Sequence, residues 1–491
     1  MREIIHIQAG SLSNYTGTHF WNTQENYFVY DEEDISMTDH NISFSEGRDE
    51  HNQPTLCPRL LAFDQKSNFG TLARGSHQEE ALAWPTTWHG ELLRQEQERI
   101  PRSEYHSRLD LEDVSEQAEP VAQIRYWSDF SRVFFDPKSI QAVPDTPELT
   151  EGDWNASSAA FSRYDDNVEL MDGSLRLLVE DCNNLQGVQM IQDTSTFGGF
   201  SNSLLCAFRE EHPKATIMSF SCLSSMSLLH ANIGDSSQVM RVLNDTLSLR
   251  SVAEFCDLTI PILPPPQWEK NCWFPRHDID KTSPYQTSAI LSAHIETATL
   301  PLRLKGGFDD LQTIVAHLNW RKSTPFAALG GTLCPQGLST ENLQDIASLS
   351  IHSNGRPFFA RRDVSRGLSE YEETAHDAWA RAHGLKEPFL KWHHLPSCPI
   401  PTSFPPIFPD ARPKVLKMIS SLSTSPSTGG QLFDYAQFLE SAAKRRDSAL
   451  LTMGIEGDEV KELVSALWDI VDEYGDNEGG GGDLGEGMDE E

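Results

Sequence analysis

Two short polar turns are the places in this sequence where backbone groups could hold a phosphate. The first is Gly10-Ser11-Leu12-Ser13-Asn14, and the second is Phe197-Gly198-Gly199-Phe200-Ser201-Asn202. Each follows an apolar run, and N–H groups at the start of a following helix can bind an anion that glycines allow to approach closely. A plain strand-to-helix turn, with Asn14 as a cap, explains the same residues without a ligand, so both interpretations stay open. The candidate nucleotide contacts are Gly10, Asn14, Gly198, Gly199 and Ser201.

Other reactive patterns are missing from the sequence. It contains no G-x-x-x-x-G-K-[ST] P-loop, no G-x-S-x-G nucleophile elbow and no H-E-x-x-H zinc motif. The adjacent His393 and His394 would point to different faces of any regular element, so they make a poor metal pair. None of the eight cysteines forms a C-x-x-C pair, which indicates buried thiols in a reducing compartment. We therefore expect no metal site and no nucleophilic catalysis.

The elements around the two turns predict an α/β protein with a parallel sheet. Helices are expected over Asp172–Leu185 and from about Ser203 to His212, with Thr194–Asn202 as a turn before the second one. Strand, helix and strand in this order are typical of βαβ units with right-handed crossovers. The expected strands are 4–9, 60–63, 188–192 and 216–221.

The remaining segments are predicted to be loops, connectors and C-terminal helices. Residues 31–53 are acidic and poor in apolar side chains, which indicates a surface loop or a disordered insertion. Proline-rich extended connectors are expected at 260–266 and 396–413. After the second connector we expect helices, including an amphipathic one whose apolar face contains Leu467. Residues 472–491 carry nine acidic and no basic side chains, so this tail should be disordered and either solubilise the chain or attract a basic partner.

The charge balance excludes several kinds of partner. The chain has 491 residues, and 39 basic against 73 acidic side chains give a net charge of −34. Such a surface repels nucleic-acid phosphates and anionic lipid, so no direct nucleic-acid partner is expected. No apolar stretch approaches the roughly 20 residues of a membrane helix. The first residues resemble neither a secretory signal nor a transit peptide, so we expect a location in the cytosol or on the cytosolic face of an organelle.

A series of motifs resembles the tubulins, in the same order along the chain. MREIIHIQAG followed by Asn14 is similar to the opening of β-tubulin, and Cys57–Asp64 (CPRLLAFD) is similar to a later tubulin strand. Cys182–Gly187 (CNNLQG) resembles the tubulin C-x-x-L-Q-G, and Asn244–Ser248 (NDTLS) resembles N-A-T-L-S. Two segments have no tubulin counterpart and resemble instead the Misato family of tubulin-related proteins: Arg125–Phe130, with 137–139 after it, and Pro399–Phe408.

The resemblance implies a tubulin-like fold: a parallel-sheet nucleotide-binding domain, then an α+β domain and C-terminal helices with an acidic tail. The implied boundaries are 1–258 for the first domain, with an acidic insert at 31–53 and a Misato-specific segment at 120–145, then 259–395, the connector 396–413, the helices 414–474 and the tail 475–491.

The nucleotide chemistry of the tubulins looks eroded in this sequence. Lys66 aligns with an acidic residue that helps tubulins to hold Mg²⁺, and a lysine cannot bind a hard cation. Thr313 aligns with the catalytic glutamate of α-tubulin, beyond the loop Phe308–Leu311, and a threonine cannot deprotonate water as a carboxylate does. The glutamine of the first phosphate loop is absent, and the base-contacting asparagine has no match around 285–289. The resemblance thus leaves GTP binding open, with GTP hydrolysis not expected.

The resemblance also implies a cellular role. It points to a non-enzymatic factor in the partitioning of mitochondria and the inheritance of mitochondrial DNA, located on the cytosolic face of mitochondria and in the cytoplasm. Expected partners are proteins of the mitochondrial outer surface, with tubulin and the cytosolic chaperonin as further candidates. The alternatives are a GTP-binding, polymerising cytoskeletal enzyme and an adaptor of the chaperonin that folds tubulin.

Overall fold

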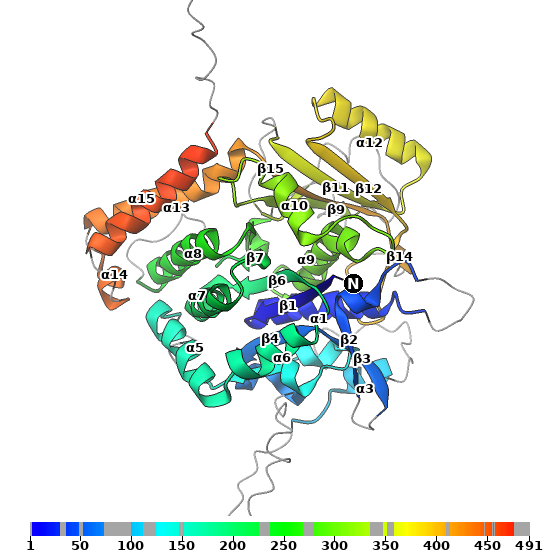
Figure 1. The fold of residues 1–491 in the computed structure, drawn as a ribbon, viewed down its shortest axis with the longest axis horizontal. Helices are drawn as coiled ribbons and strands as arrows, with labels where there is room; N and C mark the ends of the chain where they lie inside the picture. The colour runs from blue at the N-terminus through cyan, green and yellow to red at the C-terminus, as the bar shows by residue number, and fades with distance from the viewer. Residues whose placement is uncertain are drawn as a thin grey trace, which may run out of the picture.

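In the computed structural model, two large β-sheets lie on either side of a central helix, with further helices on the outer faces (Figure 1). Two further sheets have two strands each. The residues that it describes are 2–29, 36–48, 53–72, 100–110, 124–146, 149, 152–224, 236–268, 279–333, 347–350, 358–408, 413–445, 447–453, 455 and 457–475.

The first sheet has six strands in the order β5-β4-β1-β6-β7-β8. All neighbouring pairs are parallel, as the βαβ pattern predicted. The four strands expected from the sequence are confirmed, each extended by a few residues or fewer. The strands are β1 (Glu3–Ala9), β4 (Leu60–Gln65), β5 (Ile140–Val143), β6 (Leu185–Asp193), β7 (Thr216–Cys222) and β8 (Leu258–Ile262).

Helices cover both faces of this sheet, which explains why β1 is buried along its whole length. On one face, Ile5 and Ile7 share a core with Phe197 and Phe200 of α7. On the other face, Ile4 belongs to the core that contains α9. The covering helices are α1 (Ser11–Glu25), α5 (Trp154–Val168), α7 (Thr194–Glu211), α8 (Ser236–Phe255) and α9 (Pro284–Thr299).

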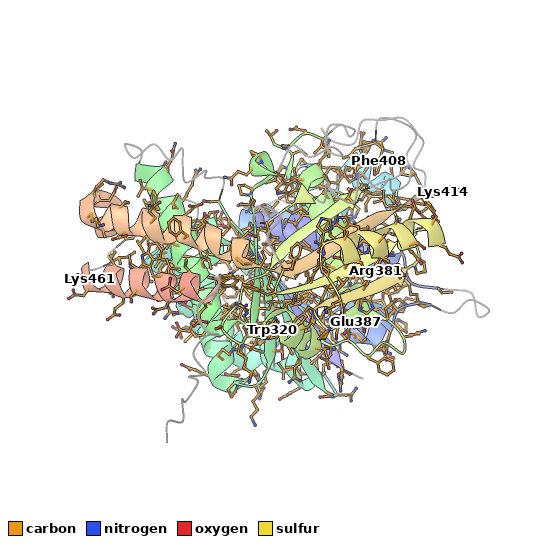
Figure 2. All side chains as sticks on the ribbon, turned by 90° about the horizontal axis from the view of Figure 1, so that it is seen from above. Trp320, Arg381, Glu387, Phe408, Lys414 and Lys461 are labelled. Atoms are coloured by element: carbon orange, nitrogen blue, oxygen red, sulfur yellow. The ribbon has the colours of Figure 1, made fainter. Side chains whose placement is uncertain are left out.

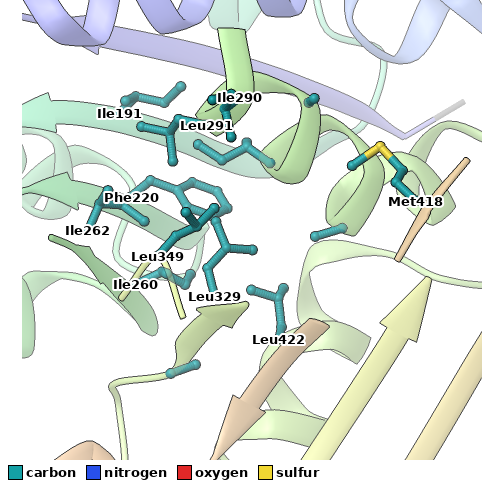
Figure 3. Close-up of a cluster of buried hydrophobic side chains, with 14 of the residues drawn as sticks. Ile191, Phe220, Ile260, Ile262, Ile290, Leu291, Leu329, Leu349, Met418 and Leu422 are labelled. Carbon is teal, nitrogen blue, oxygen red and sulfur yellow. The ribbon is translucent and has the colours of Figure 1, made fainter. Parts of the chain in front are cut away.

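The second sheet has five strands in the order β10-β9-β15-β11-β12, and only β11 and β12 run parallel. Figure 3 shows the core between the two sheets, where Phe220 and Ile260 of the first sheet approach Leu329 and Leu422 of the second. The elements are β9 (Ala328–Leu333), β10 (Ala347–Ser348), β11 (Ala360–Arg366), β12 (Leu390–Leu395), β15 (Met418–Thr424), α10 (Leu311–Leu318) and α12 (Glu370–Ala382).

The chain ends in helices that pack along α8, at the left of Figure 1. They are α13 (Pro426–Arg445), α14 (Ser448–Thr452) and α15 (Gly457–Glu473). Leu467 of α15 is fully buried, which confirms the predicted apolar face. The acidic tail beyond Gly475 lies outside the described residues. The short elements are β2 (Phe44–Arg48), β3 (Pro54–Pro58), α3 (Glu104–Asp110), α6 (Arg176–Glu180), β13 (Cys398–Pro399), β14 (Val415–Leu416) and the 3₁₀ turns η2 (Lys66–Leu72) and η4 (Trp127–Phe130).

Several sequence-based expectations are wrong in detail. Thr194–Asn202 is not a turn, because α7 begins directly after β6. The segment 31–53 is not all loop, since β2 pairs with β3 and buries Phe44. The segment after residue 414 is not purely helical, because β15 is a central strand. The connector expected at 260–266 begins inside strand β8. The helix expected over Asp172–Leu185 ends at Glu180, where the chain turns into β6.

No helix in the described part of the chain combines the length and the apolar character that crossing a membrane requires.

Candidate functional site

The candidate site is the edge of the first sheet at which β1, β4 and β6 end. Ligands of open parallel sheets bind outside the carboxyl ends of the strands, and both sequence-predicted turns follow strands that end here. The structure brings Gly10 and Asn14 to this edge, beside the carboxylates of Asp64 and Asp193.

Gly10 lets α1 begin directly after β1 and point its N-terminus into the site. Its φ of 109° lies in the region that favours glycine, and a Cβ on it would come within 2.5 Å of the Asp193 carboxylate. The N-cap residue Gly10 has no side chain with which to cap α1, so the first N–H groups of the helix are available to an acceptor from elsewhere. A helix N-terminus of this kind is where a phosphate would be expected to bind.

The acceptor at this N-terminus is a side chain of the protein itself. Leu12 N–H donates to Oδ2 of Asp193 at 2.8 Å, and Ser13 N–H donates to Oδ1 at 3.0 Å. The Ser13 hydroxyl donates to the same Oδ1 at 2.6 Å. Asp193, the last residue of β6, is buried. An incoming phosphate would have to displace this carboxylate or lie next to a like charge.

A second carboxylate, Asp64 at the end of β4, is surrounded by donors. Asn14 Nδ2 donates to it at 3.2 Å, and also to the Phe63 carbonyl at 2.9 Å. Asn14 therefore links α1 to β4, and the alternative that it caps its helix is wrong. The Trp127 indole N–H donates to Asp64 at 3.2 Å. Trp127 belongs to a segment without a tubulin counterpart, so this segment covers the site.

A third carboxylate, Asp245 of α8, lies next to the end of β7. It accepts hydrogen bonds from the Thr194 hydroxyl at 2.6 Å and from the Tyr435 hydroxyl at 3.1 Å. The Ser224 hydroxyl donates at 2.7 Å. Thr194 begins α7 and Tyr435 lies on α13, so this acid ties the sheet edge to the C-terminal helices.

The three carboxylates have raised pKa values because they are buried among neutral donors. Burial raises the pKa of Asp193 to about 7, and the hydrogen bonds from Ser13 and Leu12 offset only part of that effect. Burial likewise raises the pKa of Asp64 to about 6 and raises that of Asp245. The negative charge of Asp64 raises the pKa of Asp193 further. The three carboxyl groups therefore bind protons more readily than usual, and a further negative charge at this edge is unfavourable.

The second predicted turn does not reach the site. Gly198 and Gly199 lie inside α7, where they allow helices to pack closely. A Cβ on Gly199 would lie 2.2 Å from the Trp154 carbonyl of α5, and one on Gly198 would lie 2.3 Å from the Ser248 hydroxyl of α8. Ser201 is buried in the same helix. Without a loop between β6 and α7, no backbone wraps around a phosphate from this side.

The loop before α10 has structural contacts at every polar position that the tubulin resemblance singled out. Thr313 forms a capping box with Asp310 at the start of α10. Asp309 binds Arg362 at 2.5 Å and His393 at 2.8 Å. Although burial acts to raise it, the hydrogen bond from His393 and the charge of Arg362 lower the pKa of Asp309 to about 2. Lys66 is exposed at the start of η2.

The two segments without tubulin counterparts meet on α1. Asn22 Nδ2 donates to the Phe130 carbonyl and to the Ser403 hydroxyl, both at 2.8 Å. The Arg132 N–H donates to Asn22 Oδ1 at 2.9 Å. The Tyr285 hydroxyl of α9, where the expected base-contacting asparagine has no match, donates to the Ser403 carbonyl at 2.7 Å. These segments are thus built into the body of the protein.

Sequence reasoning missed Asp193, Asp245 and the role of Trp127. One signal was available for the first of these. Asp193 directly follows a predicted strand, as Asp64 does, and carboxyl ends of parallel strands meet at one edge. The direction of the Trp127 side chain had no local signal, because its partner lies 63 residues away.

The parallel sheet and its covering helices agree with the tubulin-like domains that this chain matches in sequence. Residues 2–111 match the Misato Segment II tubulin-like domain, and residues 117–304 match a tubulin domain. Protein DML1 of Gibberella zeae is 29% identical, over 96% of this chain and 97% of that protein. Protein dml1 of Aspergillus niger is 28% identical, over 97% of this chain and 100% of that protein. Protein misato of Drosophila melanogaster is 27% identical, over 62% of this chain and 60% of that protein.

Proposed function

Because the chain belongs to the Misato family of tubulin-like proteins, we propose that it is a non-enzymatic factor that works without a bound nucleotide. Its proposed role is the partitioning of mitochondria and the inheritance of mitochondrial DNA. The family resemblance supports the cellular role, and the sheet edge supports the absence of nucleotide chemistry.

The single observation that carries the non-enzymatic part is the Asp193 carboxylate at the N-terminus of α1. It accepts the N–H groups of Leu12 and Ser13 that a phosphate would need. A nucleoside triphosphate brings several negative charges, and repulsion between like charges is strong in a buried, low-dielectric site. The residues at this edge therefore do not fit GTP.

The neighbouring groups support the same conclusion about turnover. The Thr313 hydroxyl donates to Asp310 at 2.8 Å and is not basic enough to deprotonate an attacking water. The Asp64 carboxylate, with a pKa raised to about 6 by burial, accepts from Asn14 and Trp127 instead of facing an open metal site.

The decisive biochemical test measures GTP binding and phosphate release by the purified full-length chain. We expect no change of melting temperature with GTP and Mg²⁺, whereas a ligand present at 100 times its Kd would stabilise the fold by about 2.7 kcal/mol. Phosphate release should equal the buffer blank, with or without added tubulin. Measurable turnover that Asp193→Asn alters would overturn the proposal.

The cellular part is tested by depletion and protease protection. Loss of the chain should leave daughter cells short of mitochondria and mitochondrial DNA before the microtubule array changes. Earlier loss of microtubules would favour the alternative of a chaperonin adaptor in tubulin folding. We further propose a peripheral position on the mitochondrial outer surface, so protease added to intact mitochondria should remove the protein.

A further inference from the structure

An exposed aromatic and basic surface lies where the described chain ends, and we propose that the acidic tail, residues 476–491, docks on it. The surface consists of Trp320, Arg321, Lys322, Lys386 and Phe389, and we call it the tryptophan patch. This inference concerns a contact within the chain and does not depend on the proposed function.

The aromatic part of the patch is unusually open to solvent. Trp320 is 47% exposed and Phe389 is 42% exposed, and their ring centroids lie 5.6 Å apart. The Trp320 indole N–H donates to the Phe359 carbonyl at 3.1 Å, which fixes the ring at the surface. Rigid, exposed aromatic side chains next to arginine are typical of the energetic centres of interfaces.

The basic part of the patch is notable in a chain with a net charge of −34. Arg321 lies over the ring of Phe359 at 3.6 Å, a cation–π contact that leaves its N–H groups to other acceptors. Within the described residues, no acidic side chain forms an ion pair with Arg321, Lys322 or Lys386. Glu387, which follows Lys386 in the sequence, is an exposed acid, so the patch and Glu387 together carry three cations and one acid.

The end of α15 delivers the tail directly to this surface. Tyr474 is buried, and its hydroxyl donates to the Phe326 carbonyl at 2.8 Å. Its ring centroid lies 6.4 Å from that of Phe359, the residue that carries Arg321. Figure 2 shows Trp320 beside Glu387, well away from Lys461 near the start of α15. The tail thus starts next to the tryptophan patch.

Length and chemistry of the tail match the patch. It has 16 residues, with seven acidic and no basic side chains, and at about 3.3 Å per residue it can reach roughly 50 Å. Leu484 and Met488 are its apolar side chains, and a thioether or an isobutyl group packs well on an aromatic ring. A short tether gives an effective concentration in the mM range, so even weak contacts are occupied.

A partner that carries more positive charge than the patch would compete for the tail. High salt would weaken the charged part of the contact, because the screening length falls from about 8 Å at physiological ionic strength to about 3 Å at 1 M salt.

Zero-length carbodiimide coupling of the full-length protein tests this proposal. An equal mixture of ¹⁴N- and ¹⁵N-labelled protein distinguishes links within one copy from links between copies. We expect tail carboxylates to couple mainly to Lys322 and Lys386 of the same copy. Arg321→Glu should reduce these links at least fivefold, whereas Lys461→Glu, at a side chain 79% exposed elsewhere on the surface, should leave them unchanged. Coupling to Lys461 as frequent as to Lys322, or links only between copies, would overturn the proposal.

A competition experiment provides a second measurement. A labelled synthetic peptide of residues 476–491 should bind a chain that ends at Gly475 at least tenfold more tightly than it binds the full-length chain, because the tail occupies the patch. Replacing both Leu484 and Met488 by serine in the peptide should weaken binding. Equal binding to the two chains, or none to the truncated one, contradicts the docking of the tail.

Discussion

Buried acids at the edge of the first sheet and in the second sheet are held in opposite ways. At the edge, Asp193 is bound by neutral N–H and O–H groups, and burial raises its pKa to about 7. In the second sheet, Arg361 Nε lies 2.8 Å from Asp363, and His376 lies 3.0 Å from it. Burial opposes ionisation there too, but the charge of Arg361 and the His376 hydrogen bond lower the pKa of Asp363 to about 2.

A larger ionic cluster joins the second sheet to α9 and α1. Glu296 of α9 is fully buried and lies 3.2 Å from Arg366 of β11 and 3.5 Å from Arg303. The Tyr27 hydroxyl donates to Glu296 at 3.0 Å. Burial alone therefore does not identify a functional acid, because buried Asp193 and buried Asp363 have pKa values shifted in opposite directions. The charges of the second sheet are paired with opposite charges, whereas the acids at the edge are bound by neutral groups.

The largest effect is expected from removing a cation of the second region. Arg366→Ala leaves Glu296 with one fewer buried partner and should destabilise the fold by about 3–5 kcal/mol. Arg250→Ala is the control, since Arg250 pairs with Glu254 on the surface and should cost no more than about 0.5 kcal/mol. Urea unfolding measures both. Equal urea midpoints for the two variants would contradict the claim that the buried charges of the second sheet stabilise the fold.

The next effect comes from neutralising one acid in each region. Asp363→Asn should cost about 3 kcal/mol, because it leaves the guanidinium of Arg361 buried without its counter-charge. Asp193→Asn keeps one of the two acceptor oxygens for the helix N–H groups and loses no buried cation partner, so it should change the free energy of unfolding by only about 1 kcal/mol. A larger cost for Asp193→Asn at pH 8, above the Asp193 pKa of about 7, would show that its charge matters.

A smaller effect on stability is expected at Gly199, where it distinguishes a role in helix packing from a role in ligand binding. Gly199→Ala should destabilise by about 1–3 kcal/mol, because the added methyl group overlaps the Trp154 carbonyl. Gly430→Ala in α13, where a Cβ meets nothing within 4 Å, should instead stabilise by about 0.5–1 kcal/mol. Thermal unfolding without any nucleotide reveals the difference. If Gly199→Ala left the melting temperature unchanged, close helix packing would not explain this glycine, and Gly199 would again be a candidate ligand contact.

The most gradual effect is the pH dependence at the edge. The folded pKa of Asp193, about 7, lies above its usual value near 3.9, so the folded state binds the proton more tightly. Stability from this group is complete below pH 4 and falls as the pH rises towards 7, at no more than ~1.4 kcal/mol per pH unit. Asp193→Asn should flatten the profile over that range.

The opposite sign applies to Asp363. Its folded pKa, about 2, lies below the usual value, so its contribution is present above pH 4 and is lost as the pH falls towards 2. Urea midpoints of the wild-type chain and of both Asp→Asn variants, measured from pH 3 to 8, separate the two acids. Parallel profiles for all three proteins would contradict the assignment.

Apolar runs predicted the first sheet well and the second sheet poorly. β1 could be recognised because apolar and polar residues alternate over 4–9. β11 reads ARRDVSR and is fully buried. Its charges pair within the strand, with Asp309 and with residues of α9 and α12, and no local pattern identifies the distant partners. For α7, the glycines and threonines at 194–199 are weak helix formers, and packing against α5 decides the conformation.

The candidate site divides in the same way. Gly10 and Asn14 were found because the first turn joins two neighbouring elements. Gly198, Gly199 and Ser201 were misplaced because one glycine signal fits both a phosphate loop and a close helix contact. Asp193 reaches Ser13 across 180 positions, a distance over which a single sequence gives no pairing information.

The meeting of two distant segments at Asn22 sets an order of events during synthesis. Its carbonyl partner Phe130 follows after 108 residues, but Ser403 follows only after 381. At translation rates of about 5–20 residues per second, the second partner emerges roughly 20–80 s after Asn22. Contacts this far apart in sequence also close slowly. During most of synthesis, the Asn22 side chain of α1 therefore lacks its Ser403 partner. The packing of the first helix is completed only after a segment near the C-terminus has been made.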